Sequence, residues 1–582
     1  MSGAPVGALL GQLAKLTSNL TLSSATLHAL SLVLVPLAIL TVRYVIQVIL
    51  FHNGQANAGN VKQLPPKYPS FVPFLGSLIQ LGVNHKYLTE QISWYKGKLT
   101  ASRVEIFGFT YYLVQDRESL AKMFKSKALA SAIDMYEFSN NNILGCSKES
   151  SKVYRADTSG PMPAPDPRSN VLPHNRVDSI THALAFRGFT GPGMKPATRR
   201  FMKDVPNQMT HITEEWQEVP DFAQFFRETI GPSSIQCIFG PTLLRLHPTF
   251  VENIFKFDKI MPKFTSGMPR WTMPKDYEFR DMIAEQLKDW YKYARENFDE
   301  SMIDEDGDGD PIWGSAMIRN RQDQLLKADA HDDDVLAHLD LGLAWATIGN
   351  LVISCMFGAY HVLQDKTLLK RVRHELKEWL GDRSIHEADP HAMGREIPLL
   401  SSIYAESQRL HIKIYSAYSS TFEDVDLGKW KLPKGALALV NSYPSHYDKE
   451  FWNTKNGQYP VDTFWADRFI VDPADAESGP INPEYKAKTG FREKKRDDDK
   501  PYFSLEGCET AWVPYGGGFS MCPGRFIAKA FMLFSACLLA QEYEVEFHND
   551  TLEISDYRYG MGVDDLGKPI PFHIRKRATE AS

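Results

Sequence analysis

One cysteine stands in a setting suited to metal binding. Cys522 follows three consecutive glycines and precedes Pro523 and Gly524, in the stretch YGGGFSMCPG. Glycines let the backbone bend so that amide N–H groups can point at the sulfur, and the start of a helix stabilises a thiolate. The apolar stretch RFIAKAFMLFSACLLA that follows predicts a helix able to form a core wall. The alternative is that Cys522 is one more buried cysteine.

A glutamate and two arginines further upstream form a second pattern. Glu406 and Arg409 stand three residues apart in AESQRL, which places both on one face of a helix, where they can pair. Arg468 follows in the aromatic stretch VDTFWADRFI. A pair at this spacing is also common on surface helices, so these residues gain meaning only together with the cysteine motif.

Taken in chain order, these segments resemble the cytochrome P-450 superfamily across essentially the whole chain after the N-terminal segment. Tyr515, Gly518, Cys522 and Gly524 match its haem-binding pattern, with tyrosine in place of the usual phenylalanine. The resemblance implies a haem cofactor, iron protoporphyrin IX, whose iron is bound by the Cys522 thiolate.

The resemblance also gives roles to the upstream residues. Glu406 and Arg409 match the family's ExxR helix, and Arg468 matches the arginine that completes a buried triad behind the haem. All three are therefore expected to maintain the fold around the haem and to take no part in the chemistry.

Besides Tyr515, three positions depart from the usual family pattern. Ser520 stands where a basic residue normally contacts a haem propionate, so the propionate partners stay open, with Arg525 as one candidate. In LAWATIGNLVISCMF, Gly349 and Asn350 replace the acid and threonine of the helix that crosses the haem. These replacements resemble the branch of sterol 7α-hydroxylases, sterol 12α-hydroxylases and prostacyclin synthase. Asn350 is thus expected to face the haem, or else to satisfy a neighbouring carbonyl in a helix groove.

The expected reaction follows from the same two positions. Gly349 has no side chain and Asn350 cannot donate a proton as an acid does, although its amide can orient a water. The branch contains true hydroxylases and also an isomerase that needs no external electrons. We therefore expect a monooxygenase acting on a bulky lipophilic substrate, such as a sterol, terpenoid or polyketide-derived secondary metabolite. The alternatives are a redox-neutral isomerase or dehydratase and, less favoured, a non-enzymatic haem carrier or sensor.

A monooxygenase of this kind needs electrons from outside, and the sequence has no evident flavin or nicotinamide domain. For a membrane-anchored member the resemblance implies the NADPH-dependent diflavin reductase of the endoplasmic reticulum. It would dock on a basic face near the cysteine, for which Arg525 and Lys529 are candidates. The formal charge of −6, from 65 basic and 71 acidic residues, gives no reason to expect a nucleic-acid partner. Six widely spaced cysteines suit a reducing compartment.

The N-terminal part predicts a membrane anchor. Residues 29–50 are almost entirely apolar and, as a helix of about 33 Å, would cross a bilayer core. A cleaved signal peptide is the alternative, because ANA at 56–58 mimics a cleavage site, but the apolar run is longer than a signal core. Basic residues gather after the span, which places the bulk of the chain in the cytosol. We divide the chain into a lumenal segment 1–28, an anchor 29–50 in the endoplasmic reticulum membrane, a proline-rich hinge 51–76 and a haem-thiolate catalytic domain 77–582.

The globular part is expected to be mainly α with small, local, antiparallel β-sheets. Amphipathic helical patterns dominate residues 178–382, while β-like stretches include the hairpin ASRVEIFGFTYYLVQD and the segments ALALVNS and IPFHIRKR. The acidic run from Asp304 to Asp310 opens like an EF-hand calcium loop but has Ser315 where that loop needs glutamate. A solvated loop is predicted there.

Overall fold

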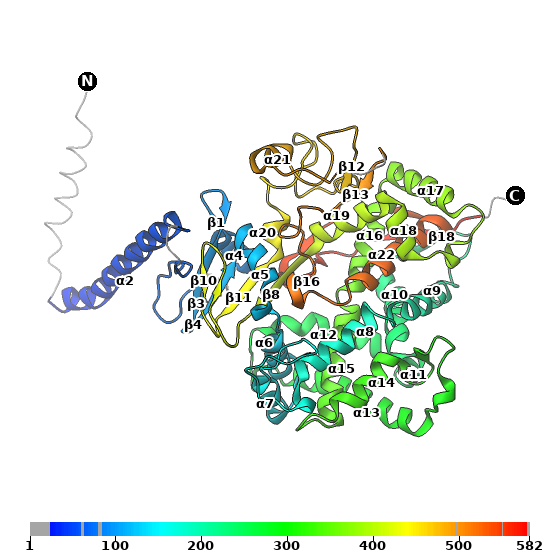
Figure 1. Cartoon of the computed structure of the whole chain (residues 1–582), viewed down its shortest axis with the longest axis horizontal. Coiled ribbons are helices and arrows are strands. Elements are labelled where there is room, and N and C mark those ends of the chain that lie inside the picture. Colours follow the sequence, from blue (N-terminus) through cyan, green and yellow to red (C-terminus); the bar gives the residue numbers. More distant parts are fainter. Residues whose placement is uncertain (1–23, 60–62, 79–83, 495–498, 550, 579–582) are drawn as a thin grey trace.

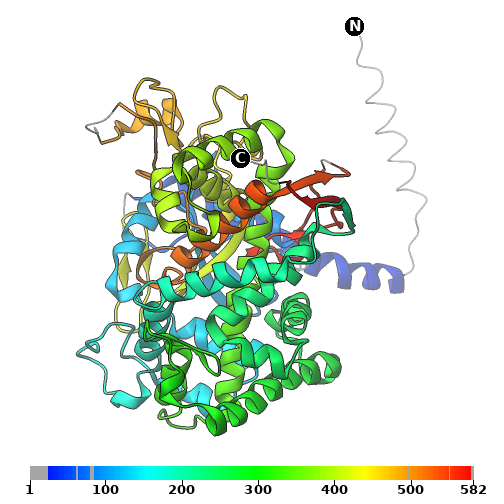
Figure 2. The same ribbon diagram turned by 90° about the vertical axis from the view of Figure 1, so that its right-hand side faces the viewer.

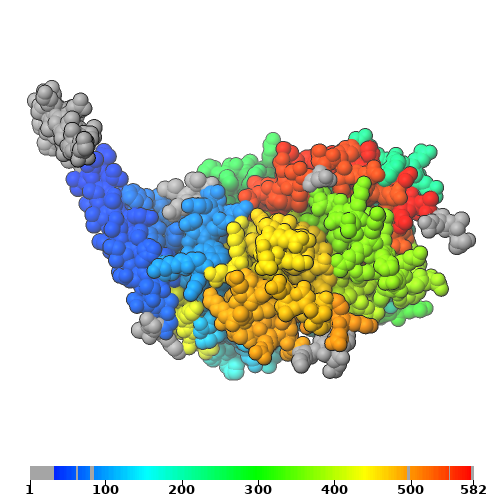
Figure 3. Space-filling model, turned by 90° about the horizontal axis from the view of Figure 1, so that it is seen from above, coloured from blue at the N-terminus to red at the C-terminus, as the bar shows by residue number. Residues whose placement is uncertain are grey.

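The computed structural model describes residues 24–59, 63–78, 84–494, 499–549 and 551–578 of the 582-residue chain. Most of the described residues belong to one large, mainly helical body with small sheets, as expected from the sequence (Figure 1). The N-terminal helix α2 (Ser24–Ala56) projects from one end of that body, and Figure 3 shows it in blue at the edge of the molecule.

Helix α2 contains a segment that can cross a membrane. Leu32–Ala56 is long and apolar enough by length and composition, and its side chains from Leu32 to Leu50 are exposed or partly exposed, with Leu32 at 76% and Leu50 at 62%. The predicted anchor 29–50 lies inside α2, but the helix continues to Ala56, so residues 51–56 are helical and not part of the proline-rich hinge. No proline occurs between Leu50 and Pro65, so no proline prevents the helix from continuing past Leu50. Of the predicted lumenal segment 1–28, residues 1–23 lie outside the described residues.

The end of α2 is attached to the body by packing. Phe51 and Gln55 are buried there, and the Gln55 side chain donates to the backbone oxygen of Ala101 at 3.0 Å. The Phe51 ring meets the edge of Tyr68, with the centroids 5.6 Å apart. These contacts hold the apolar helix at a defined place on the body.

The helices of the body start where the sequence supplies caps. Asp116, Asp221, Asp332 and Asp365 each accept backbone N–H bonds at the first turn of a helix, which satisfies donors that would otherwise be unpaired. The helices are α4 (His85–Ser93), α5 (Arg117–Lys125), α6 (Ile133–Phe138), α7 (Lys148–Ala156), α8 (Val177–Phe189), α9 (Met194–Gln208), α10 (Phe222–Phe239), α11 (Pro241–Leu246), α12 (Phe250–Thr265), α13 (Pro274–Asn297), α14 (Ala316–Leu325), α15 (Asp333–Ile348), α16 (Leu351–Gln364), α17 (Lys366–Leu380), α18 (Pro390–Glu396), α19 (Pro398–His411), α20 (Ser442–His446), α21 (Pro483–Thr489) and α22 (Arg525–Glu542).

Helix α16 is the centre of the core. Every residue from Leu351 to Leu363 is buried, as expected for a helix that is apolar on all sides. It packs against α22, α10 and α19, and Figure 2 shows the orange α22 running across the green helices. The span Asp333–Gln364 also has the length and hydropathy of a membrane helix, but it is mostly buried inside the protein and is therefore a core element.

The largest sheet has the strand order β16-β8-β11-β4-β3. The predicted hairpin is confirmed: β3 pairs with β4 through a turn at Phe107 and Gly108, which both have positive φ, at 49° and 78°. The predicted antiparallel pattern holds except that β11 pairs with β4 in parallel. The strands are therefore not local, because β11 comes from far along the chain. Their bounds are β3 (Ala101–Ile106), β4 (Phe109–Val114), β8 (Ile412–Tyr418), β11 (Leu437–Asn441) and β16 (Met561–Val563).

A three-stranded antiparallel sheet lies at the end of the body far from α2 (Figure 1). It consists of β14 (Tyr543–Phe547), β18 (Phe572–Lys576) and β5 (Gln217–Val219), with β18 in the middle. The remaining strands form two-stranded pairs, β1 (Trp94–Tyr95) with β2 (Lys98–Leu99), β6 (Gly309–Asp310) with β7 (Gly314–Ser315), β9 (Val425–Asp426) with β10 (Lys431–Leu432), β12 (Ile470–Val471) with β13 (Tyr502–Phe503), and β15 (Ile554–Ser555) with β17 (Asp565–Leu566).

The acidic run before α14 is solvated only in its first part, because residues 304–307 are exposed whereas residues 308–310 are buried. Asp308 and Asp310 are buried, and each pairs with an arginine: Asp308 with Arg200 at 2.7 Å and Asp310 with Arg319. The pairing neutralises the carboxylates, so this run serves as an ionic anchor for the helices around it.

Candidate active site

The loop before α22 is built so that only glycine fits at its turns. Gly516 and Gly518 have positive φ, at 72° and 71°. A Cβ on Gly518 would lie 2.8 Å from the backbone oxygen of Phe124, and one on Gly517 would lie 2.4 Å from the Phe124 ring. The glycines therefore let the loop press against the end of α5.

Cys522 sits at the end of this loop. Its backbone N–H donates to the Tyr515 oxygen at 3.0 Å and closes the loop. Helix α22 begins at Arg525 with Gly524 as its N-cap, so Cys522 and Pro523 lie just before the helix and not in its first turn. The hydroxyl of Thr190, at the end of α8, donates to the Pro523 oxygen at 2.6 Å and fixes the loop from the other side.

The thiol of Cys522 faces an interior space. Its side chain is exposed, whereas the other five cysteines are buried. Burial by the surrounding protein nevertheless raises the pKa of the thiol, against the opposing effects of the Gly524 backbone N–H and the Arg525 charge. A sulfur that water can reach while protein surrounds it borders an internal cavity and not the outer surface.

The central helix breaks at two of the positions that depart from the family pattern. Helix α15 ends at Ile348 and α16 begins at Leu351, so Gly349 and Asn350 form the junction. Ala346 has an exposed side chain one turn before the break, between the buried Ala344 and Ile348. Ala346 therefore contributes an exposed methyl group next to the break.

Asn350 bonds to a strand and not to a neighbouring carbonyl in a helix groove. Its Oδ1 accepts the backbone N–H of Val563 at 3.1 Å, which ties the helix break to β16. Gly562 lies so close that a Cβ there would be 2.0 Å from Asn350 Oδ1, and its φ of 144° also favours glycine. Gly349 offers no side chain to the junction.

A polar network supports the cysteine loop from behind. The Tyr515 hydroxyl accepts from Tyr404 at 2.9 Å and from Gln408 Nε2 at 2.7 Å, both on α19. The Gln408 Oε1 accepts the Ser354 hydroxyl of α16 at 3.3 Å. Tyr515 is the position where the family pattern usually has phenylalanine, so its hydroxyl adds a link between the loop and two core helices.

The predicted triad is assembled and fully buried. Arg409 donates to both carboxylate oxygens of Glu406, at 2.7 and 2.8 Å, and Arg468 Nε donates to Oε1 at 2.9 Å. Burial alone would raise the pKa of Glu406, but the two guanidinium charges outweigh it and hold the pKa below its ordinary value. Arg409 also donates to the backbone oxygens of His446 and Val461, both at 2.7 Å, and so fastens the chain between α20 and β12.

Ser520 lies beside hydroxyl groups and not beside a cation. The Tyr418 hydroxyl donates to the Gly517 oxygen and accepts the Gly517 N–H, both at 3.0 Å, and Ser416 and Ser520 lie within hydrogen-bonding reach of it. Arg525 points back along its own helix and donates to the Cys522 oxygen at 2.9 Å. A role of Arg525 toward a propionate stays a prediction.

Lys529 is less available for docking than the sequence suggests. Its ammonium group lies 5.3 Å from the Tyr404 ring centroid and 5.1 Å from the Phe503 ring centroid. Burial, together with the Arg395 charge, lowers its pKa to about 8. The side chain is held against two aromatic rings instead of projecting from the surface.

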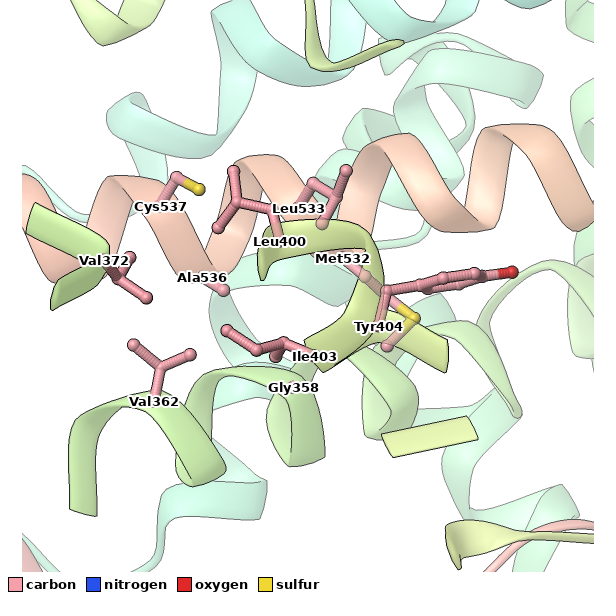
Figure 4. A pocket seen from close by; sticks show the side chains of 10 residues that line it. All are labelled: Gly358, Val362, Val372, Leu400, Ile403, Tyr404, Met532, Leu533, Ala536 and Cys537. Atoms are coloured by element: carbon pink, nitrogen blue, oxygen red, sulfur yellow. The ribbon is translucent and has the colours of Figure 1, made fainter. Parts of the chain in front are cut away.

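An apolar gap between α16, α19 and α22 is not a second site. Figure 4 shows its lining side chains, with the Tyr404 hydroxyl pointing away from the gap. The gap has a volume of about 10 Å³, at the lower limit for a single water, and its lining is apolar. It is a packing gap behind the cysteine loop.

Sequence reasoning missed several residues at this site. The Tyr136 phenol on α6 is close enough to Cys522 for their charges to interact, and Tyr404, Gln408 and Tyr418 hold the loop. Gln408 stands inside AESQRL but at a position that the ExxR motif leaves open, and the other three belong to no motif. A buried tyrosine and glutamine on the helix that carries Glu406 and Arg409 were the only local signal available.

The residues present fit a haem. Cys522 is the accessible thiol among six cysteines, and it receives a backbone N–H from Gly524 that stabilises a thiolate. A Cβ on Gly524 would come no closer than 3.7 Å to the sulfur, which leaves room around it. A single thiolate facing an internal space matches the ligation of a flat iron macrocycle better than a structural zinc site, which needs four protein ligands.

Comparisons with known proteins agree with this geometry. The Cytochrome P450 family model matches residues 184–464. Cytochrome P450 monooxygenase efuG of Hormonema carpetanum is 28% identical over 529 residues, covering 88% of this chain and 90% of that protein. Cytochrome P450 monooxygenase fsoE of Humicola fuscoatra is 28% identical, covering 90% of this chain and 89% of that protein. Cytochrome P450 7A1 of Oryctolagus cuniculus is 24% identical, covering 54% of this chain and 56% of that protein. With its cysteine loop, its buried triad and these relatives, the chain belongs to the cytochrome P450 family.

Proposed function

We propose that this P450 monooxygenase oxidises a bulky lipophilic substrate such as a sterol, a terpenoid or a polyketide-derived secondary metabolite. The observation that carries the proposal is the junction at Gly349 and Asn350, next to the exposed methyl group of Ala346. Gly349 and Asn350 resemble the residues of the sterol-hydroxylase branch at these positions, and a relative from Rattus norvegicus is a 25-hydroxycholesterol 7-alpha-hydroxylase, 24% identical over 276 residues.

The haem would be held by Cys522 and, when bound, supplies the reductive activation of dioxygen that a monooxygenase needs. The chain's own part is to hold the sulfur in place and to favour its thiolate form. Burial raises the pKa of the thiol, and the Gly524 backbone N–H and the Arg525 charge oppose that rise. The network through Tyr515 fixes the loop from behind, so the sulfur keeps one position relative to α15 and α16.

Asn350 would orient groups in the cavity and not supply protons as an acid. Its Oδ1 is held by Val563, which directs the amide along β16 and leaves the Nδ2 donors to meet a water or a substrate oxygen. Gly349 has no proton to give. Proton delivery therefore has to come through ordered water at the helix break, where the exposed Ala346 face gives room for it.

Electrons would come from a redox partner, for which we propose the NADPH-dependent diflavin reductase of the endoplasmic reticulum. The proposed organisation is a lumenal segment 1–28, an anchor within α2, a short proline-rich connection and a cytosolic catalytic domain from about residue 77 onward. The exposed apolar α2 supports membrane attachment. Near the cysteine, Arg525 is the better candidate for docking, because Lys529 is held between aromatic rings.

Product analysis tests the reaction. Membranes containing the full chain and a diflavin reductase are incubated with sterol and terpenoid substrates under ¹⁸O₂, with and without NADPH. We expect an oxidised product that depends on NADPH and carries one ¹⁸O atom. Product formed at full rate without NADPH and without label would instead establish a redox-neutral isomerase or dehydratase. Spectral shifts with no product would identify a carrier or sensor.

A further inference from the structure

Three potential metal ligands meet on the outer face of the sheet β14-β18-β5. His573 lies in the middle strand, and Glu218 on β5 is its direct cross-strand partner. His548 follows β14 and pairs its backbone with Pro571, so it is the diagonal neighbour of His573 on the same face. Three segments of the chain thus bring two imidazoles and one carboxylate together.

The spacing of these groups matches a transition-metal site. His548 Nε2 and His573 Nδ1 are 3.3 Å apart, and one ligand atom of each of the three residues lies within 4.8 Å of the other two. A zinc ion bound to two imidazoles at about 2.0–2.1 Å in tetrahedral geometry separates the two nitrogens by about 3.3–3.4 Å. The two rings already stand at that separation. Only the Glu218 side chain has to move closer.

The groups around the two histidines favour the binding of a metal cation between them. Glu546 is the other direct cross-strand partner of His573, so a second carboxylate shares this face. His548 and Glu218 are exposed and His573 is partly exposed, which lets an ion reach the site from water. In Figure 1 this sheet lies at the opposite end of the molecule from α2, well away from the apolar helix.

We propose that Glu218, His548 and His573 form a binding site for a divalent transition metal of the zinc class. Two imidazoles and one carboxylate are the ligand set that zinc accepts with a fourth position left to water. The metal would join β5, which leads into α10, to the C-terminal strands β14 and β18. It would therefore stabilise the C-terminal sheet, and its binding would weaken at acidic pH because the imidazoles must be neutral.

Calorimetric titration of the full-length haem-loaded protein in detergent with Zn²⁺ tests the site. We expect one saturable site, and a Tm that rises with Zn²⁺ concentration. His573→Ala and His548→Ala should each weaken binding at least about tenfold, and Glu218→Gln should weaken it less. His386→Ala is the matched control, because His386 lies against Glu542 at 2.6 Å on the surface without a second histidine.

The following results would contradict the proposed metal site. A wild-type affinity in His548→Ala and Glu218→Gln, or an equal loss in His386→Ala, would overturn the proposal. So would the absence of any saturable binding in a sample with full haem content. His548 follows the strand and is exposed, so its substitution leaves folding intact and the test does not depend on His573 alone.

Discussion

The Oδ1 atom of Asn350 accepts the backbone N–H of Val563 at 3.1 Å, across the junction between α15 and α16. The contact joins the helix that borders the cavity to a strand that lies 213 positions later in the sequence. Gly562 makes the approach possible, because any side chain there would collide with the same oxygen. Asn350 therefore has a positioning function in addition to any part in oxygen chemistry.

Asn350→Ala should slow NADPH-dependent turnover at least about tenfold while leaving haem incorporation intact. The substitution leaves the Val563 N–H without its partner, at a cost of about 1–3 kcal/mol, and removes the amide that orients water. Turnover and the carbon monoxide difference spectrum measure the two effects separately. Thr347→Ala is the control, since the Thr347 hydroxyl bonds within its own helix to Leu343. Unaltered turnover in Asn350→Ala would remove this residue from the mechanism.

Cys522→Ser and Cys522→Ala should abolish the carbon monoxide difference spectrum typical of a thiolate-bound haem. No other thiol is accessible to take over as ligand. Cys237→Ala, at a buried thiol on α10, should keep the spectrum. A thiolate-type spectrum that survives in Cys522→Ala would assign the ligand to another cysteine.

Glu406→Gln should prevent stable haem loading. The change leaves the charges of Arg409 and Arg468 buried without their carboxylate, and breaking a buried ion pair costs about 3–5 kcal/mol. The haem content of purified protein and its urea midpoint provide the measurement. Lys327→Ala breaks the exposed pair with Asp323 and should change stability by less than about 1 kcal/mol. Equal stability in the two variants would contradict the assigned role of the triad.

Lys529→Met should be more stable than the wild type at pH 7, and the difference should shrink as the pH rises above about 8. The pKa of Lys529 is lowered from 10.5 to about 8 by burial and by Arg395. Between these two values the folded protein binds fewer protons at this site than the unfolded chain, so wild-type stability rises with pH. Denaturant unfolding from pH 7 to 10 measures the free energy of unfolding of both proteins, and Lys327→Met, at an exposed lysine, is the control. A difference in the free energy of unfolding that stays constant from pH 7 to 10 would contradict this prediction.

Tyr515→Phe should lower the free energy of unfolding by about 1–3 kcal/mol and keep the thiolate-type spectrum. The substitution restores the ring that the family usually has but leaves the Gln408 amide without its partner. A double-mutant cycle with Gln408→Leu should give a coupling of at least about 0.5 kcal/mol. Additive effects of the two changes would mean that the network does not act as a unit.

The sequence was sufficient for the parts of the site that local motifs define. The turn glycines, Cys522 and the Glu406–Arg409 pair stand where spacing alone suggests a shared function, and the structure brings Arg468 to the same carboxylate. The mainly α fold class and the β3–β4 hairpin are confirmed for the same reason, since helical periodicity and a glycine turn are local signals. The roles of the site residues themselves stay predictions.

The contacts that cross long stretches of sequence could not be predicted. The partner of Asn350 is a backbone group in β16, and the partners of Tyr515 lie on α19, so packing alone determines which groups meet. The burial of Asp308 and Asp310, in the run before α14, could not be predicted for the same reason. Their composition indicates a solvated loop, but arginines from α9 and α14 take them out of water.

Because β4 pairs with β11, one edge of β4 has no partner until β11 has been synthesised. Tyr112 in β4 pairs with Ala438 in β11, so the β3–β4 hairpin, next to the membrane helix, is made long before its neighbour. Ribosomes add about 5–20 residues per second, so the open edge of β4 waits on the order of tens of seconds. An unpaired strand edge is prone to wrong partners during such an interval. Production of this enzyme in a foreign host therefore depends on whether that edge stays protected until residue 441 has left the ribosome.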